Sequence, residues 1–245
     1  MSELPALILL HGVGLDQSMW THQVACFSST HRVITYDLLG HGTQRRRGTK
    51  LDDWIGQLES LVGQLQLGRF SLLGFSFGSM IAEAYAAKHE DRSDRLVLMS
   101  TVYDRSEADR AGVVARLELA RQEGPQAMIS AALARWFSPA ANPELLAHYD
   151  RLLRRNNAED FIAAYECFAR SDESLTGILA KFQRPTLVLT GELDTGSTPA
   201  MAKKLAGVIP RAQCYIVPGA RHMMPVEMPD TVNAPVARFL SGAKL

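Results

Sequence analysis

The feature that most constrains this chain is a serine placed between two glycines. Gly74, Ser76 and Gly78 have the spacing Gly-x-Ser-x-Gly, with an apolar run at 70–75 before them and a helical pattern at 77–88 after them. In that context the spacing predicts a nucleophile elbow, a tight strand-to-helix turn that exposes the serine hydroxyl. Glycines let neighbouring backbone pass close to such a turn, and the following helix directs its first amides at a developing negative charge. Ser76 is therefore the candidate nucleophile.

Composition narrows the class of protein. A length of 245 residues suits one large α/β domain, or one domain with an insertion. The 26 Lys and Arg residues equal the 26 Asp and Glu residues, so no overall field attracts nucleic acid or a membrane surface. Cys26, Cys167 and Cys214 are odd in number and form no Cys-x-x-Cys pair, which favours a reducing compartment. With no leader-like segment and no long apolar run, we expect a cytoplasmic protein that binds neither nucleic acid nor membranes.

Short apolar runs alternate with longer helical patterns along much of the chain. Such alternation predicts a mostly parallel sheet, and nearly continuous apolar character is typical of strands covered on both faces. Helices are expected at 52–65 and 77–88, and a third opens at Thr198 and Pro199, a cap residue followed by a proline at the first helical position. The predicted strands are residues 6–10, 32–36, 70–75, 95–99, 186–190 and 214–217.

Residues 104–180 break this alternation. The segment lies between two predicted strands and contains only helical patterns, at 111–122, 125–136, 143–155 and 160–169. Ligands of doubly wound sheets bind beyond the carboxyl ends of the strands, so an insertion at that edge would form a lid. We therefore expect a core made of residues 1–103 and 181–245, and a helical cap made of residues 104–180.

A nucleophilic serine needs a base, and the base needs a carboxylate that orients it. Around an elbow the expected chain order is Ser, then Asp or Glu, then His. Asp194 follows the predicted strand 186–190 and His222 follows 214–217, so both should reach the edge of the sheet that carries Ser76. Asp104 is the alternative acid because it follows the strand ending at Met99. We prefer Asp194, since the insertion begins at Asp104, and expect its carboxylate within hydrogen-bonding distance of His222.

Two further motifs follow the first two predicted strands. His11, Gly12 and Val13 follow the first, and an Asp-x-x-Gly-x-Gly turn at 37–42 follows the second. Together with Ser76, Asp194 and His222, these motifs make the chain resemble the α/β-hydrolase superfamily over nearly its whole length. The resemblance implies an α/β-hydrolase fold. Its members usually carry a strand hairpin before the strand that ends in His-Gly, whereas only five residues precede Ala6. We therefore expect a six-stranded sheet without that hairpin, and a homo-oligomer in which a partner subunit covers the exposed edge.

The same resemblance assigns roles to loop residues. The backbone amides of Val13 and Phe77 would form the oxyanion hole. His11 and His41 are expected to be structural, binding backbone groups to hold their loops.

Within the superfamily the chain is similar to 3-oxoadipate enol-lactonases at residues 14–20 and 123–139. Those lactonases often have a serine-containing segment where this chain has His11 and Gly12. Arg135 and Trp136 lie in the second of these segments, and an arginine can hold a carboxylate through two parallel hydrogen bonds. The resemblance implies that this pair contacts an acidic substrate. The alternative is a solvated arginine beside a core tryptophan.

These observations lead to one main functional prediction and two alternatives. The main prediction is a serine hydrolase, without metal or cofactor, that cleaves a small carboxylated ester or lactone through an acyl-enzyme. The first alternative is the same machinery acting on an amide or carbon–carbon bond of a small acidic catabolic intermediate. The second is a non-catalytic ligand-binding protein, against which the complete set of three residues argues. A serine at the elbow argues against the aspartate-dependent chemistry of haloalkane dehalogenases and epoxide hydrolases.

Overall fold

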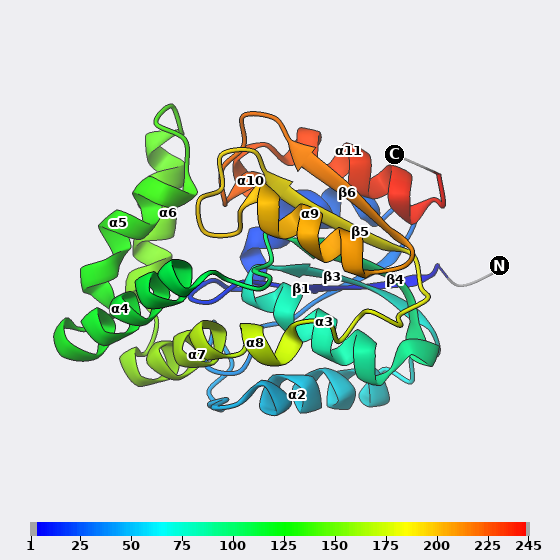
Figure 1. The fold of residues 1–245 in the computed structure, drawn as a ribbon, viewed down its shortest axis with the longest axis horizontal. Helices are drawn as coiled ribbons and strands as arrows, with labels where there is room; N and C mark the ends of the chain where they lie inside the picture. The colour runs from blue at the N-terminus through cyan, green and yellow to red at the C-terminus, as the bar shows by residue number, and fades with distance from the viewer. Residues whose placement is uncertain (1–3, 244–245) are drawn as a thin grey trace.

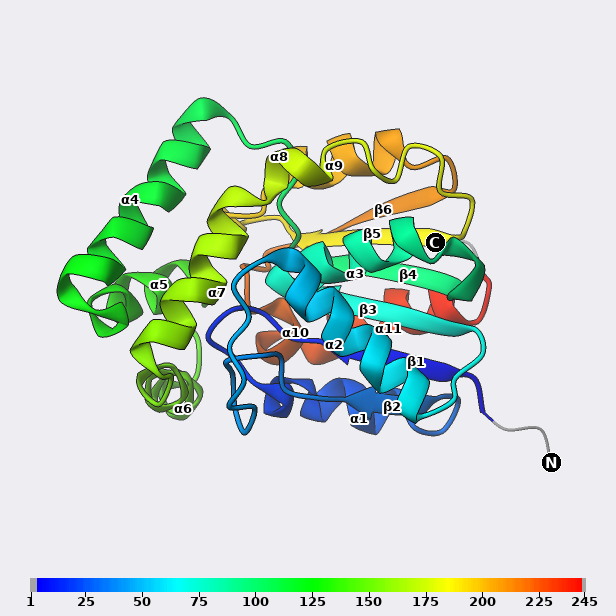
Figure 2. The same cartoon turned by 90° about the horizontal axis from the view of Figure 1, so that it is seen from below.

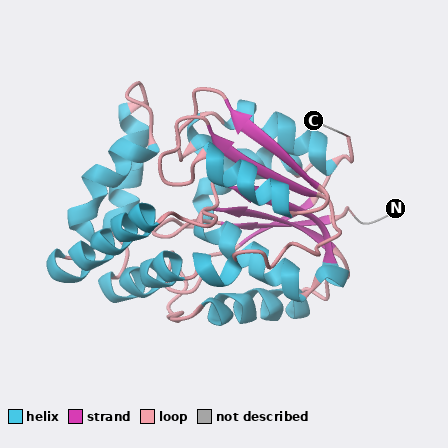
Figure 3. Cartoon of the chain, in the orientation of Figure 1, coloured by secondary structure: helices cyan, strands magenta, loops and turns pink. Residues whose placement is uncertain are grey.

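The chain forms one parallel sheet between two layers of helices (Figures 1 and 3). The computed structural model describes residues 4–243. All neighbouring strands are parallel, in the order β2-β1-β3-β4-β5-β6. This arrangement confirms the predicted six-stranded sheet and the α/β-hydrolase fold. The strands are β1 Ala6–Leu10, β2 Arg32–Thr35, β3 Phe70–Phe75, β4 Ser93–Met99, β5 Thr186–Gly191 and β6 Ala212–Val217.

The helices form two groups. Those that flank the sheet are α1 Thr21–Phe27, α2 Leu51–Gln64, α3 Phe77–Lys88, α9 Pro199–Val208, α10 Met224–Glu227 and α11 Pro229–Leu240. Those that lie between β4 and β5 in the chain are α4 Glu107–Glu123, α5 Ile129–Trp136, α6 Pro143–Arg154, α7 Ala158–Arg170 and α8 Asp172–Leu175. Short 3₁₀ turns cover Gln17–Trp20, Glu90–Arg92 and Pro125–Met128. No helix within residues 4–243 combines the length and apolar character that a bilayer crossing needs.

Helices cover both faces of the sheet, which explains why the central strands β1 and β3 are mostly apolar and fully buried. On one face Ile8 and Leu72 pack into the core beneath α2, α3 and α9. On the other face their neighbours Leu7 and Leu73 pack beneath α1 and α11 (Figure 2). Burying one such leucine completely stabilises the fold by about 1.5–3 kcal/mol, so both faces contribute to the core.

Strand β2 forms one edge of the sheet. It pairs with β1 alone, and its residues are exposed or half-buried, whereas every residue of β1 and β3 is buried. Within the described residues no strand precedes β1. The backbone groups along the outer side of β2 are thus open to pairing, as predicted for a sheet without the leading hairpin.

Helices α4 to α7 lie beyond the carboxyl ends of the strands (Figure 1). Helix α4 begins at Glu107, four residues earlier than predicted, because Ser106 caps it. The Ser106 hydroxyl accepts a hydrogen bond from the Asp109 amide at 3.1 Å, and the Asp109 carboxylate accepts one from the Ser106 amide at 3.3 Å. The helix predicted at 125–136 starts with the 3₁₀ turn Pro125–Met128 and becomes α-helical at Ile129.

Glu83 is an acidic side chain buried on α3. One of its carboxylate oxygens accepts a hydrogen bond from the Thr101 hydroxyl at 2.7 Å, and the other has no partner among residues 4–243. Burial raises the pKa of Glu83 from 4.5 to about 8, so the side chain is a neutral acid in the folded protein at pH 7. Between those two pH values the unfolded chain releases a proton that the folded chain keeps. Rising pH therefore favours unfolding through this group.

We predict that Glu83→Gln stabilises the protein more as the pH rises from 4.5 to 8. The amide keeps an oxygen for Thr101 and cannot ionise, and each unit between the two pKa values corresponds to roughly 1.4 kcal/mol. Melting temperatures of both proteins measured across this range test the prediction. Glu123→Gln, at an exposed position, is the matched control and should show no such trend. A stabilisation by Glu83→Gln that is equal at pH 4.5 and pH 8 would contradict it.

Candidate active site

Ser76 occupies a strained turn between β3 and α3. Its backbone angles are φ 54° and ψ −116°, a conformation that costs a non-glycine residue about 1–3 kcal/mol. The Ser76 amide donates to the carbonyl oxygen of Met99 on β4 at 2.8 Å, and the Ser76 carbonyl accepts from the Ser79 amide at 3.0 Å. These bonds hold the residue in place at the carboxyl end of β3.

The glycines on either side of Ser76 permit very close backbone contacts. A Cβ atom on Gly74 would lie 2.5 Å from the Cα atom of Ser79 in α3. A Cβ atom on Gly78 would overlap the carbonyl oxygen of Leu10 and lie 2.6 Å from that of His11. The first turn of α3 therefore rests directly on the end of β1. Only glycine allows this approach, as the motif predicted.

His222 and Asp194 form a buried pair beside the elbow. Asp194 follows β5, His222 follows β6, and their Oδ2 and Nδ1 atoms lie 2.7 Å apart. The other carboxylate oxygen of Asp194 accepts from the amides of Gly196 and Ser197, both at 2.9 Å. Burial alone would raise the pKa of Asp194, but the neighbouring imidazole and these two amides outweigh burial and lower it. The carboxylate is therefore ionised and fixed in orientation.

Asp104, the alternative acid, is directed elsewhere. It forms an ion pair with Lys204 on α9 rather than with His222. It also has a positive φ of 46°, at the point where the chain leaves the sheet toward α4.

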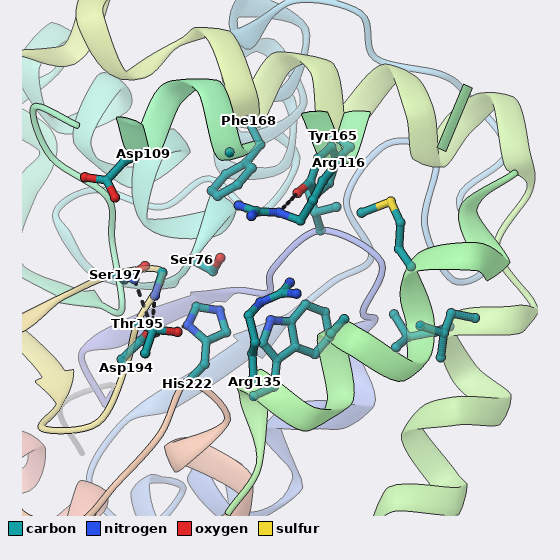
Figure 4. A pocket seen from close by; sticks show the side chains of 18 of the residues that line it. Ser76, Asp109, Arg116, Arg135, Tyr165, Phe168, Asp194, Thr195, Ser197 and His222 are labelled. Atoms are coloured by element: carbon teal, nitrogen blue, oxygen red, sulfur yellow. Dashed lines mark hydrogen bonds and ion pairs between the residues drawn. The ribbon is translucent and has the colours of Figure 1, made fainter. Parts of the chain in front are cut away.

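Two aromatic rings lie close to the imidazole of His222. The ring centroid of Phe75 lies 4.9 Å from that of His222, and the centroid of Trp136 lies 5.8 Å away at an interplanar angle of 32°. Figure 4 shows Ser76 next to this imidazole, at the same side of the cavity. No hydrogen bond joins their side chains in the part of the chain that is described. Such bonds often tighten only when substrate is bound.

Two backbone amides near Ser76 are free to bind an anion. Neither the Val13 nor the Phe77 amide donates to an acceptor within residues 4–243. Phe77 is the first residue of α3, where amides have no intrahelical partner, and Val13 lines the same cavity as Ser76. The Asn156 side chain donates to the Gly14 carbonyl at 2.8 Å and so supports the loop that carries Val13.

His11 and His41 bind backbone groups, as expected. The Nε2 atom of His11 accepts from the Leu38 amide at 3.0 Å, and its Nδ1 atom donates to the Gly12 carbonyl at 2.9 Å. The Nδ1 atom of His41 donates to the Leu39 carbonyl at 2.9 Å. Burial, strengthened by His41, lowers the pKa of His11 to about 3, so this ring is neutral.

A cavity of about 210 Å³ lies above Ser76, between the sheet and helices α4, α5 and α7. Exposed lining residues mark its mouth, with Ala108 and Asp109 in the first turn of α4 on one side and Thr195 and Gly196 on the other. The deeper wall on the α5 side is apolar and includes Met128, Ile129 and Ala132.

Two arginines without carboxylate partners extend into this cavity (Figure 4). The Arg116 Nε atom donates to the Tyr165 hydroxyl at 3.0 Å, and the Arg135 Nη1 atom donates to the Ala131 carbonyl at 3.1 Å. Neither guanidinium pairs with an acidic side chain among the described residues. Burial, followed by repulsion from Arg116, lowers the pKa of Arg135. Trp136 lines the cavity beside Arg135, so both members of the predicted pair face it.

Arg116 and Tyr165 were missed in the sequence. They lie on α4 and α7, 49 residues apart, and meet only because these helices pack together. For an arginine in the middle of a helix, no local sequence pattern shows whether its side chain is solvated or lines a cavity.

The comparisons with known proteins agree with this fold and site. The Alpha/beta hydrolase family profile matches residues 7–234. A hydrolase of Acinetobacter baylyi, named for (E)-2-((N-methylformamido)methylene)succinate, is 30% identical over 237 residues, which are 96% of this chain and 89% of the relative. The 3-oxoadipate enol-lactonase 2 of the same organism is 28% identical over 237 residues, covering 95% and 87%.

Solved structures agree as well. The enol-lactonase of Burkholderia xenovorans superposes with a TM-score of 0.89 at 30% identity, covering 98% of this chain and 92% of the other. A thermophilic esterase of Thermogutta terrifontis, solved with malate bound, gives a TM-score of 0.87 at 28% identity, covering 99% and 91%. The chain therefore belongs to the α/β hydrolase family. Its nearly full-length similarity to enol-lactonases and related enzymes makes it a hydrolase of that fold.

We predict that Gly78→Ala lowers stability by roughly 1–3 kcal/mol or more, because the new methyl group would overlap the backbone at the end of β1. Gly56→Ala, in the interior of α2, is the matched control. No atom lies near its Cβ position, and alanine favours a helix interior over glycine by about 1 kcal/mol. Thermal unfolding of the two variants should therefore shift in opposite directions. Equal or higher stability of Gly78→Ala would contradict the close contact.

Proposed function

We propose that this protein is a serine hydrolase that cleaves small esters or lactones carrying a carboxylate. One observation carries the proposal: Ser76 and the His222–Asp194 pair share a single cavity with the unpaired guanidinium groups of Arg116 and Arg135. The first three groups supply acyl-transfer chemistry and the last two supply affinity for an anion.

The proposed reaction has two stages. The Ser76 hydroxyl attacks the substrate carbonyl while His222 takes its proton, and Asp194 holds the imidazole in the required tautomer. The amides of Val13 and Phe77 stabilise the negative oxygen of the tetrahedral intermediate. His222 then donates its proton to the leaving group, and an acyl-enzyme remains. Water activated by His222 releases the product and restores the serine.

Charge supports an acidic substrate. Arg116 and Arg135 have no carboxylate partner among the described residues, and their positive charges repel each other. An anionic ligand bound between them would relieve this repulsion. The names of the relatives point the same way, since one refers to a substituted succinate and another to 3-oxoadipate, and the esterase structure holds malate. Trp136 would shield the imidazole from bulk water while Arg135 binds the carboxylate.

We further propose that residues 104–180 act as a cap that sets substrate choice. Their helices supply both arginines, Tyr165 and the apolar wall of the cavity, whereas the sheet region supplies Ser76, His222 and Asp194. Chemistry and selectivity would thus come from different parts of the chain.

Amide hydrolysis by the same residues is the second candidate. The relative named for an N-methylformamido-methylene succinate favours it, because that name describes an amide that is also a dicarboxylate. A panel of lactones, esters and enamides of equal size separates the two candidates by relative kcat/KM.

We predict that Ser76→Ala abolishes turnover and labelling by a fluorophosphonate probe while the melting temperature stays near that of the wild type. The hydroxyl is the proposed nucleophile, and alanine removes it with little change in volume. Mass spectrometry of the labelled protein should find the probe on Ser76 alone. Ser79→Ala, one turn further along α3, is the control and should still be labelled. A probe attached to another serine would refute the assignment.

We predict that Arg135→Met and Arg116→Met each raise KM by ~10–100-fold for p-nitrophenyl hemisuccinate. A hydrogen-bonded arginine–carboxylate pair is worth roughly 1.5–3 kcal/mol. The neutral substrate p-nitrophenyl butyrate should be nearly unaffected. The matched control is Arg151→Met, at an exposed position of α6.

Steady-state kinetics of the three variants on both substrates test whether Arg116 and Arg135 bind the substrate carboxylate. Equal losses on the acidic and the neutral ester would make the arginines structural. No loss on either ester would make them solvated, and the proposal would fall back to a hydrolase of small esters in general.

A further inference from the structure

The residues on both sides of His222 bind the end of helix α5. Arg221 donates through Nη1 to the carbonyl oxygens of Ala134, at 2.6 Å, and Phe137, at 3.2 Å. The Met223 amide donates to the Trp136 carbonyl at 2.9 Å. The loop that carries His222 is therefore bonded to three carbonyls at the C-terminal end of α5.

These bonds supply what a helix end lacks. The last four carbonyls of an α-helix have no partner within the helix, and the partial negative charge there favours a cation. At the end of α5 the Phe137 amide donates to the Leu133 carbonyl. Arg221 and the Met223 amide donate to three of the carbonyls beyond it, as described above. Glu227 adds a second contact, because its carboxylate accepts from the Ser138 amide at 3.1 Å.

Helix α5 also carries the two side chains that face the proposed substrate from that side. Arg135 and Trp136 lie in its last turn, and the Trp136 ring packs against the His222 imidazole. Other contacts between the insertion and the rest of the chain hold different helices. Arg47 pairs with Asp160 in α7, and the Asn156 side chain, just after α6, donates to the Gly14 carbonyl. The contacts that align α5 with His222 are therefore those of Arg221, Met223 and Glu227, and Arg221 is the one that binds two carbonyls through its side chain.

We infer that Arg221 is a positioning residue, which sets the distance between the base His222 and the anion-binding Arg135 by closing the C-terminal end of α5. This inference rests on the proposed function of those two side chains. Arg221 itself does not line the cavity, so it would act through them and not on the substrate.

The test compares Arg221→Met, Arg221→Lys and a control. Lysine keeps the positive charge but replaces the planar guanidinium by a compact ammonium group. The control is Arg211→Met, because Arg211 also donates to a carbonyl, that of Gln183, but precedes the amino-terminal end of β6, away from the cavity. Hydrogen exchange of the Phe137 and Met223 amides reports the contact itself. Rates of fluorophosphonate labelling at Ser76, and kcat and KM on p-nitrophenyl hemisuccinate, report the site.

We expect both Arg221 variants to exchange these amides roughly 10–100-fold faster than the wild type, since hydrogen bonds from a charged donor are lost. Labelling should slow and KM should rise together, by ~10-fold or more, while Arg211→Met behaves as the wild type. In the Arg221→Met background, adding Arg135→Met should raise KM by much less than it does alone, because Arg135 is already misplaced.

Three results would overturn the inference. Wild-type exchange and kinetics in both variants would show that α5 does not depend on Arg221. Faster exchange with unchanged labelling and KM would show a contact that does not position the site. Full recovery in Arg221→Lys would assign the effect to charge alone. Failure of the proposed function is distinct, because the wild-type protein itself would then not be labelled at Ser76.

Discussion

The close contact between helix α3 and the end of β1 is the constraint on which the site depends. Because Gly78 has no side chain, the first turn of α3 rests against the carbonyls of Leu10 and His11. That contact joins the start of α3, where Phe77 directly follows Ser76, to the end of β1, which is followed by Val13 in the lining of the cavity. It also helps to hold Ser76 in a backbone conformation that only surrounding structure can sustain. The strain of one residue is thus compensated by the packing of two elements.

Parallel strands then bring distant residues together. Since β3, β5 and β6 all end at the same edge of the sheet, Ser76, Asp194 and His222 meet there although up to 146 positions separate them. The amides of Gly196 and Ser197 fix the Asp194 carboxylate, and aromatic rings fix the imidazole. The carboxylate and the imidazole each have a fixed support, as the proposed acyl transfer would require.

The distribution of charge separates the site from the rest of the molecule. Overall the chain is neutral, and exposed arginines such as Arg47, Arg121 and Arg154 form ion pairs with carboxylates. Arg116 and Arg135 face the cavity and bind only a hydroxyl and a carbonyl. An unpaired cation in a partly desolvated position is costly to the fold, which is reasonable where a ligand supplies the missing anion. The neutral total therefore gives no sign of the two guanidinium groups that line this cavity without a carboxylate partner among the described residues.

The sequence alone determined the fold and the positions of the central residues. Short, mostly apolar runs predicted the six strands, and the Gly-x-Ser-x-Gly spacing located the elbow, because both signals are local and have a direct steric cause. It also placed Asp194 and His222 after the right strands. Tertiary structure decided the rest. Asp194, which follows β5, contacts His222, which follows the neighbouring strand β6, whereas Asp104 pairs with Lys204. Arg116 joins the cavity, and Arg221 closes α5, only through the packing of segments 49 and 87 residues apart in the chain. No local pattern encodes such contacts, since the direction of a long side chain depends on the neighbours that the fold brings to it.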